Sequence, residues 1–188
     1  MNAMLLFPGA GSSADHPSLV AIERRSPWPV TRADFLYRRQ GRRAPDKPAV
    51  LLQTVVDEAT RLRADRLVLG GRSMGGRVCS IAVAEHRVDA VGLVLLSYPL
   101  HPPGRVERLR VEHFSRIDVP CLFISGTRDA FATRNELTEH TAAIKGKVEH
   151  VWLDGLGHDL KDANETLADH VAIWLSRLSP RRRRDPRG

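Results

Sequence analysis

The sequence Gly70-Gly71-Arg72-Ser73-Met74-Gly75-Gly76 lies between a short apolar segment, residues 66–69, and an apolar stretch with helical spacing that begins near Arg77. Glycines two residues before and after a serine remove side chains that would collide with neighbouring backbone at a sharp turn. Residues 71–75, with the pattern G-x-S-x-G, therefore predict a buried strand, a strained turn carrying Ser73, and a helix. The N-terminus of that helix offers backbone N–H groups and a positive dipole end to negative charge.

Short apolar runs recur along the chain at the intervals of a parallel sheet. They predict buried strands at residues 4–7, 30–35, 66–69, 91–97, 119–125 and 148–153. Between them lie stretches with helical spacing, including residues 52–62 and 167–178, and residues 133–136 have the form of a capping box. This alternation predicts an α/β fold: a doubly wound, mostly parallel six-stranded sheet with helices on both faces.

The domain organisation is expected to be simple. A chain of 188 residues has the size of one domain, and no boundary or repeat precedes Ser179. Residues 1–178 form the predicted α/β domain, and residues 179–188 form a basic tail that we expect to be flexible. Residues 98–118 are too few for a cap domain over the site, so an open site is expected.

Localisation is predicted from the N-terminus and the cysteines. Residues 1–7 lack the basic start and the long apolar stretch of a signal peptide, and no run of about 18 apolar residues could span a bilayer. Cys79 and Cys121 lie in apolar, periodic segments, where buried free thiols are expected. We therefore expect a cytoplasmic protein with no membrane partner.

The charge is basic, with a formal net charge of +7. Basic proteins attract polyanions, so nucleic acid has to be considered. Much of the excess lies in residues 38–43 and 181–187, and no aromatic residues are interleaved with these arginines. A base-stacking surface is therefore not indicated, and nucleic acid is not the expected partner.

Asp129 and His158 follow the fifth and sixth predicted strands. Ligands of doubly wound sheets bind beyond the carboxyl ends of the strands, and the chain order Ser, Asp, His is the one expected with this type of turn. A serine hydroxyl is a weak nucleophile at neutral pH, so His158 should take the proton of Ser73 while Asp129 fixes the imidazole tautomer. Asp154 is the alternative acid, but it shares its strand end with His158.

These residues predict a serine hydrolase that cleaves ester-like or other acyl bonds through an acyl-enzyme intermediate, with no metal or organic cofactor. The oxyanion hole is expected from the backbone N–H of Met74 and one from the first loop, at Ala10 or Gly9. A small-molecule acyl substrate is the expected partner. Its candidate contacts in the ligand-side loops are Arg72, His16 and His101.

The sequence resembles the α/β-hydrolase family, in particular a small lidless branch grouped with dienelactone hydrolases and with a subunit of an animal chromatin complex. The resemblance is carried by residues 71–77, 9–11, 34–37 and 41–45 and covers nearly the whole chain. It implies a minimal hydrolase core without a cap domain. Two features depart from the family: Pro8 stands where a histidine usually precedes the first-loop glycine, and one or two strands usually precede the first strand found here.

Two alternatives to a serine hydrolase are compatible with parts of the sequence. Residues 9–14 match G-x-G-x-x-A after a strand, with Asp34 about twenty residues on, as in a dinucleotide-binding site. Against this, Pro17 suggests a helix that starts too late to follow a tight glycine turn directly. The second alternative is a non-catalytic scaffold that keeps the fold and binds partners through its basic loop or tail.

Overall fold

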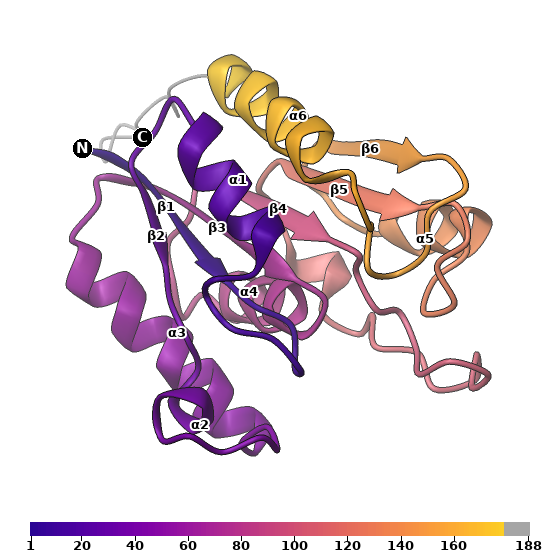
Figure 1. Cartoon of the computed structure of the whole chain (residues 1–188), viewed down its shortest axis with the longest axis horizontal. Helices are drawn as coiled ribbons and strands as arrows, with labels where there is room; N and C mark the ends of the chain where they lie inside the picture. Colours follow the sequence, from indigo (N-terminus) through magenta and orange to yellow (C-terminus); the bar gives the residue numbers. More distant parts are fainter. Residues whose placement is uncertain (179–188) are drawn as a thin grey trace, which may run out of the picture.

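The fold is built on one fully parallel sheet (Figure 1), and the computed structural model describes residues 1–178 of the chain. The predicted basic tail lies outside the described residues. The six strands run in the order β2-β1-β3-β4-β5-β6. In chain order they are β1 (Asn2–Phe7), β2 (Val30–Arg32), β3 (Arg66–Arg72), β4 (Gly92–Leu96), β5 (Cys121–Gly126) and β6 (Val148–Leu153). The predicted six-stranded α/β fold is confirmed, and every strand pair is parallel.

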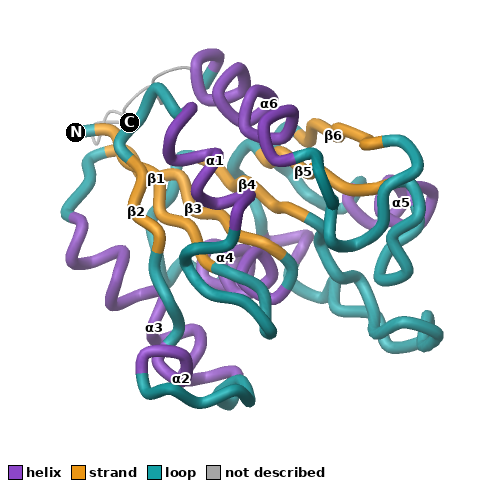
Figure 2. Tube along the Cα trace, in the orientation of Figure 1, coloured by secondary structure: helices purple, strands orange, loops and turns teal. Residues whose placement is uncertain are grey.

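Helices cover both faces of this sheet (Figure 2). The helices of residues 1–178 are α1 (Pro17–Arg25), α2 (Leu36–Arg39), α3 (Pro48–Leu62), α4 (Met74–Ala84), α5 (Arg134–Thr141), α6 (Asn164–Arg177) and the 3₁₀ helix η1 (Phe114–Arg116). α1 packs beside α6 on one face, and α3 packs beside α4 on the other. α5 begins with the predicted capping box, in which Thr133 and Glu136 each satisfy the other's backbone N–H.

Alternate residues of the strands separate two hydrophobic cores. In β1, Met4 and Leu6 pack on the side of α1 and α6, whereas Leu5 and Phe7 pack on the side of α3 and α4. All four side chains are fully buried, as the two-residue period of a strand covered on both faces requires. The burial of both faces explains why the strands appear in the sequence as continuous apolar runs.

The strand order reverses beside β1, and this reversal places the site. The chain passes from β1 through α1 to β2 on one side, then returns to β3 on the other side of β1 and continues outward to β6. The loops that follow β1 and β3 therefore leave the sheet in opposite directions, and a crevice opens between them beyond the carboxyl ends of these strands.

Some element boundaries differ from the prediction. β2 ends at Arg32 rather than at residue 35, because Phe35 is already the N-cap of α2. α4 begins at Met74, and the N–H of Arg77 already donates to the carbonyl of Ser73, 3.1 Å away. Helical structure between residues 98 and 118 is limited to η1. The two cysteines are buried and free, as predicted.

Candidate active site

Ser73 occupies a strained turn between β3 and α4. Its φ of 50° and ψ of −115° lie in a region that residues with side chains seldom adopt. The turn is this tight because β1 passes against it: a Cβ atom added at Gly71 or at Gly75 would lie 2.4 Å from the carbonyl oxygen of Phe7. The glycines on both sides of the serine are therefore required by the approach of the neighbouring backbone, as the G-x-S-x-G pattern predicts.

His158 and Asp129 lie beside this serine. The Nε2 atom of His158 is 2.9 Å from Ser73 Oγ, and its Nδ1 atom is 2.8 Å from Asp129 Oδ2 and 3.0 Å from Asp129 Oδ1. The side chain of Asp129 is 1% exposed, whereas that of His158 is 21% exposed. The imidazole thus connects a buried carboxylate to a hydroxyl that a substrate can reach, which is the geometry needed for proton transfer from a nucleophile.

The loops after β5 and β6 are tied together, and this holds the acid and the base in register. The N–H of Arg128 donates to the carbonyl of Leu156, and a Cβ atom at Gly126 would lie 2.1 Å from that same oxygen. Asp129 Oδ1 also accepts the N–H of Phe131, whose ring stacks on the imidazole of His158 at 4.0 Å between centroids. The imidazole is therefore fixed from two sides.

Asp154, the alternative acid, is turned away from the imidazole. Its Oδ1 atom accepts a hydrogen bond of 3.2 Å from the hydroxyl of Thr127, which in turn accepts the N–H of Gly155. Asp154 thus supports the connection between the two loops, and Asp129 is the carboxylate that contacts His158.

The loop after β1, residues 8–16, is held over the turn by side chains from β2 and α2. Tyr37 donates its hydroxyl proton to the carbonyl of Ala10 at 2.7 Å, and Asp34 accepts the N–H of Ala14 at 2.7 Å. Within residues 1–178 the backbone N–H groups of Ala10 and Met74 have no hydrogen-bond acceptor. Two unpaired donors beside a nucleophile are the components that an oxyanion hole requires.

The same loop bears on the dinucleotide alternative. α1 begins only at Pro17, as the sequence predicts, with His16 as its N-cap. Asp34, which would contact a ribose in a dinucleotide site, here braces the loop through Ala14. The glycines of the first loop therefore lead into an extended turn, without the direct passage from strand to helix that cradles a pyrophosphate.

Arg72 and His16 lie at the site, and His101 does not. Arg72 donates from Nη2 to the carbonyl of His158 at 2.8 Å, and burial lowers the pKa of its guanidinium, although Asp159 and Asp129 oppose that shift. The pKa of His16 is lowered by burial and by the charge of Arg72. His101 is 3% exposed and directs its ring toward Pro102 and Glu136. The expected contact of His101 with a substrate is therefore not supported, because its side chain is packed inside the protein.

A protein-family model described as an alpha/beta hydrolase domain matches residues 1–178, the whole of the described fold. The chain belongs to the α/β-hydrolase family. The more specific resemblance to dienelactone hydrolases and to a chromatin-complex subunit is not tested by this match and stays a prediction.

Solved structures agree with this assignment of the fold. Est1E from Butyrivibrio proteoclasticus superposes on this α/β hydrolase with a TM-score of 0.77 at 16% identity, over 94% of this chain and 88% of Est1E. A monoacylglycerol lipase from Paleococcus ferrophilus gives a TM-score of 0.76 at 14% identity, over 94% of this chain and 95% of the lipase. At these identities the likeness concerns the fold.

A cavity of about 650 Å³ opens beyond the carboxyl ends of the strands of this α/β hydrolase. Its lining includes the residues of the strained turn, the first loop and the imidazole: Gly9, Ala10, Gly11, Ser12, His16, Arg72, Ser73, Met74, Arg77, Pro99, Arg110, Phe131, His158 and Asp159. Sequence analysis did not identify Arg77 or Arg110. Arg77 could have been found, because it follows Ser73 by one helical turn, whereas Arg110 lies in a long segment with no periodicity.

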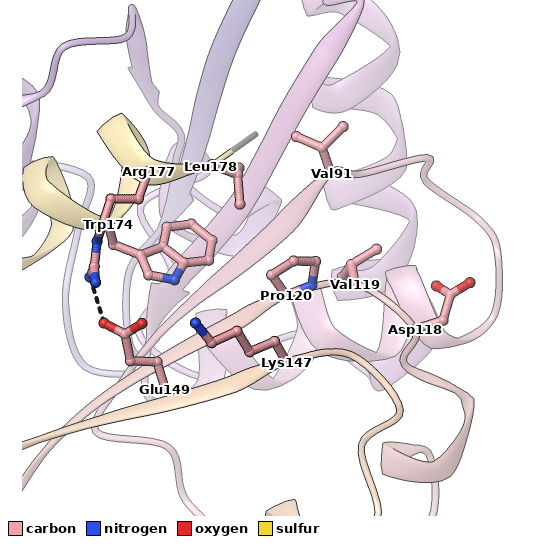
Figure 3. Close-up of a pocket in the computed structure, with 9 residues that line it drawn as sticks. All are labelled: Val91, Asp118, Val119, Pro120, Lys147, Glu149, Trp174, Arg177 and Leu178. Atoms are coloured by element: carbon pink, nitrogen blue, oxygen red, sulfur yellow. Dashed lines mark hydrogen bonds and ion pairs between the residues drawn. The ribbon is translucent and has the colours of Figure 1, made fainter. Parts of the chain in front are cut away.

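A second cavity, of about 470 Å³, lies at the opposite edge of the sheet, where β4, β5 and β6 begin (Figure 3). Its lining is Val91, Asp118, Val119, Pro120, Lys147, Glu149, Trp174, Arg177 and Leu178. These residues include no serine, cysteine or histidine, and Arg177 Nη2 pairs with Glu149 Oε1 at 2.6 Å. Of these two cavities, only the one at the carboxyl edge is therefore lined by serine and histidine side chains.

Two structural features are absent from residues 1–178. No helix in this range is long and apolar enough to cross a membrane. Nor does this part of the chain gather three or more His, Cys, Asp or Glu side chains in an arrangement that could hold a metal ion.

Proposed function

We propose that this α/β hydrolase cleaves ester-like acyl bonds with Ser73 as the nucleophile of a Ser-His-Asp triad. The observation that carries the proposal is the continuous pair of hydrogen bonds from the hydroxyl of Ser73 through His158 to Asp129, 2.9 Å and 2.8 Å long. It occurs at a strained turn, where Ser73 has φ 50° and ψ −115°. The lipase among the structural relatives supports acyl-bond hydrolysis as the reaction class.

In the first half of the reaction, His158 Nε2 takes the proton of Ser73 as Oγ attacks the carbonyl carbon of the substrate. The carbonyl oxygen becomes an oxyanion, to which the N–H groups of Met74 and Ala10 donate. When the tetrahedral intermediate collapses, the bond to the leaving group breaks, and the protonated imidazole gives its proton to that group. The acyl group remains on Ser73 as an ester.

In the second half, water takes the place of the alcohol. His158 removes a proton from the water as its oxygen attacks the acyl-enzyme, and the same two N–H groups stabilise the second oxyanion. Collapse returns the proton to Ser73 Oγ and releases the acid. Asp129 holds the proton-bearing Nδ1 of the ring throughout and stabilises the imidazolium that forms in each half.

The test is hydrolysis of a series of p-nitrophenyl esters by the wild-type chain and by the Ser73→Ala variant. We expect the substitution to lower turnover by roughly 10⁶, with little change in stability. Ser176→Ala serves as the control, since Ser176 is exposed on α6 and, within residues 1–178, its hydroxyl donates only to the carbonyl of Ala172. If Ser73→Ala kept near-wild-type turnover, the proposed nucleophile would be wrong.

A fluorophosphonate probe separates a serine hydrolase from a scaffold of the same fold. Stoichiometric labelling of the folded chain, lost in Ser73→Ala and kept in Ser176→Ala, is the result expected for a hydrolase. Folded protein that takes no label and hydrolyses none of the esters would favour the scaffold and count against the proposal.

A further inference from the structure

Two arginines of the catalytic cavity have no partner. Arg77 on α4 and Arg110 on the segment between β4 and β5 both line the cavity that contains Ser73. Neither guanidinium forms an ion pair or a hydrogen bond with any residue of the described range, 1–178. The Nε atom of Arg77 is also buried without an acceptor. Both side chains are partly buried, so these donors are partly removed from water as well.

Arg32, which is partly buried like these two, is paired: its guanidinium forms ion pairs with Asp15 and Glu23. A guanidinium that is partly desolvated without a partner lowers the stability of the fold, because its hydrogen bonds to water are not replaced. Two such groups in one cavity are therefore a feature that packing alone does not explain.

The positive charges of the two arginines repel each other. The pKa of Arg110 is lowered by burial and then by the positive charge of Arg77. The one carboxylate among the cavity-lining residues, Asp159, is exposed and acts electrostatically on Arg72. An anion placed between Arg77 and Arg110 would relieve their repulsion and supply the missing acceptors.

The segment that carries Arg110 is anchored to the helix that carries Arg77. Ser80 on α4, whose hydroxyl donates to the carbonyl of Arg77, lies 2.8 Å from His113 Nε2 through the same Oγ atom. The buried hydroxyl of Tyr98 lies 3.4 Å from Ser80 Oγ and 3.3 Å from His113 Nε2, and it donates to the carbonyl of Arg110 at 3.5 Å. This buried network ties the backbone of Arg110 to that of Arg77, and both residues line the cavity that contains Ser73.

We propose that Arg77 and Arg110 bind a carboxylate of the substrate, so that this enzyme prefers esters which carry a carboxylate near the reacting carbonyl. Half-esters of short dicarboxylic acids are the simplest members of this class. The inference rests on the proposed hydrolysis by Ser73 and adds the substrate class. A planar guanidinium group can donate two parallel hydrogen bonds to the two oxygens of a carboxylate, a geometry that the ammonium group of a lysine does not provide.

The test compares matched pairs of esters by pH-stat. Monomethyl succinate is paired with methyl 4-methylpentanoate, and 4-carboxyphenyl acetate with 4-isopropylphenyl acetate, so that each pair differs by a carboxylate against an isopropyl group. For at least one pair, we expect the wild-type chain to have a kcat/KM for the anionic ester at least tenfold above that for the neutral one. Arg77→Gln and Arg110→Gln should each lower this ratio by about 10- to 100-fold, since each removes charge-assisted hydrogen bonds. Added salt should lower the ratio as well.

Arg105→Gln is the matched control, because Arg105 is exposed in the same segment and does not line the cavity. Its ratio should equal that of the wild type. A wild-type ratio near one for both pairs, or ratios in the Arg77 and Arg110 variants equal to that of the Arg105 variant, would overturn the proposal. Circular dichroism of each variant checks that the chain is folded.

A binding measurement separates failure of this inference from failure of the proposed reaction. Glutarate is titrated calorimetrically into Ser73→Ala and into the same variant carrying Arg77→Gln or Arg110→Gln. Binding that weakens at least tenfold with either arginine substitution supports the carboxylate site even if no ester is hydrolysed. Absence of glutarate binding, or binding insensitive to both substitutions, counts against the site even if neutral esters are hydrolysed through Ser73.

Discussion

Both edges of the sheet carry a cavity, but within residues 1–178 buried polar atoms without hydrogen-bond partners line only the cavity at the carboxyl edge. At the carboxyl edge the cavity contains a buried carboxylate behind an imidazole, free backbone donors and two unpaired arginines. At the amino edge the cavity of about 470 Å³ is lined by apolar side chains, by the exposed Asp118 and Lys147, and by Arg177 in contact with Glu149. Buried polar groups left without partners therefore indicate which of the two cavities receives a ligand.

Backbone conformation separates the same two regions. Arg63, near the amino edge, has φ 46° and ψ 39°, the left-handed conformation with which helices commonly end. Ser73 has a similar φ of 50°, but its ψ of −115° places it outside that favoured region. A positive φ therefore accompanies an ordinary helix end at Arg63 and a strained backbone at Ser73. The difference lies in the contacts that hold the residue there.

The largest effect tests the buried carboxylate of the carboxyl edge. Asp129→Asn should keep the bond to the N–H of Phe131, because the amide oxygen can accept it. The amide NH₂ would then face His158 Nδ1 and favour the tautomer whose proton lies on Nε2. A protonated Nε2 cannot accept the proton of Ser73. We expect turnover of a neutral ester to fall by roughly 10⁴. Turnover above a tenth of the wild-type value would exclude this role for Asp129.

The next effect tests the packing that produces the strained turn. In Gly75→Ala the new Cβ atom would lie 2.4 Å from the carbonyl oxygen of Phe7 and 2.6 Å from that of Pro8. Since both neighbours are backbone, we expect the free energy of unfolding in urea to fall by about 3 kcal/mol. In Gly11→Ala, where a Cβ atom meets nothing within 4 Å, it should change by less than about 0.5 kcal/mol. Equal midpoints for the two variants would contradict the steric account.

The carboxyl edge was also the more predictable of the two from sequence. Buried strands form continuous apolar runs, and parallel strands bring their carboxyl ends to one edge of the sheet. The sequence alone therefore predicts that Ser73, Asp129 and His158 share one site. The structure places their side chains in contact. The glycine pattern predicted the turn because sterics act over a few residues.

Features that depend on long loops could not be predicted. His101 follows a strand, as a ligand-side residue should, yet the segment folds back and buries it against Glu136. Arg110 enters the cavity because Tyr98 and His113 anchor its segment to α4, a set of contacts between residues with no periodic spacing. Such packing depends on the whole fold, and local sequence does not encode it.

A smaller effect concerns His113, which anchors that segment. Burial lowers its pKa to about 4 from an ordinary value of 6.5, so the folded protein binds this proton less readily than the unfolded chain does. The contribution of neutral His113 to the free energy of unfolding is therefore fully present above pH 6.5, and it is lost as the pH falls toward 4. For this group alone the loss between pH 7 and pH 5 is about 2 kcal/mol.

Urea unfolding at the two pH values checks this prediction. His113→Gln should remove that part of the pH dependence, although it lowers stability at pH 7 as well, because the hydrogen bond to Ser80 is altered. His86→Asn is the control: His86 is exposed with φ 54°, a conformation that asparagine tolerates, so its pH dependence should match the wild type. An unchanged pH dependence in His113→Gln would refute the assignment.

The smallest effect is expected at the amino edge, in Glu149→Gln. The substitution removes the charge that faces Arg177, but the arginine side chain is 57% exposed and that of Glu149 is 29% exposed, so water replaces most of the lost interaction. We expect the free energy of unfolding to change by less than about 1 kcal/mol and ester turnover to stay at the wild-type level. Calorimetric unfolding and the p-nitrophenyl assay measure the two quantities. A several-fold loss of turnover without loss of stability would mean that the amino edge acts on Ser73 and His158 across the sheet, and the proposed division between a reactive edge and a structural edge would then fail.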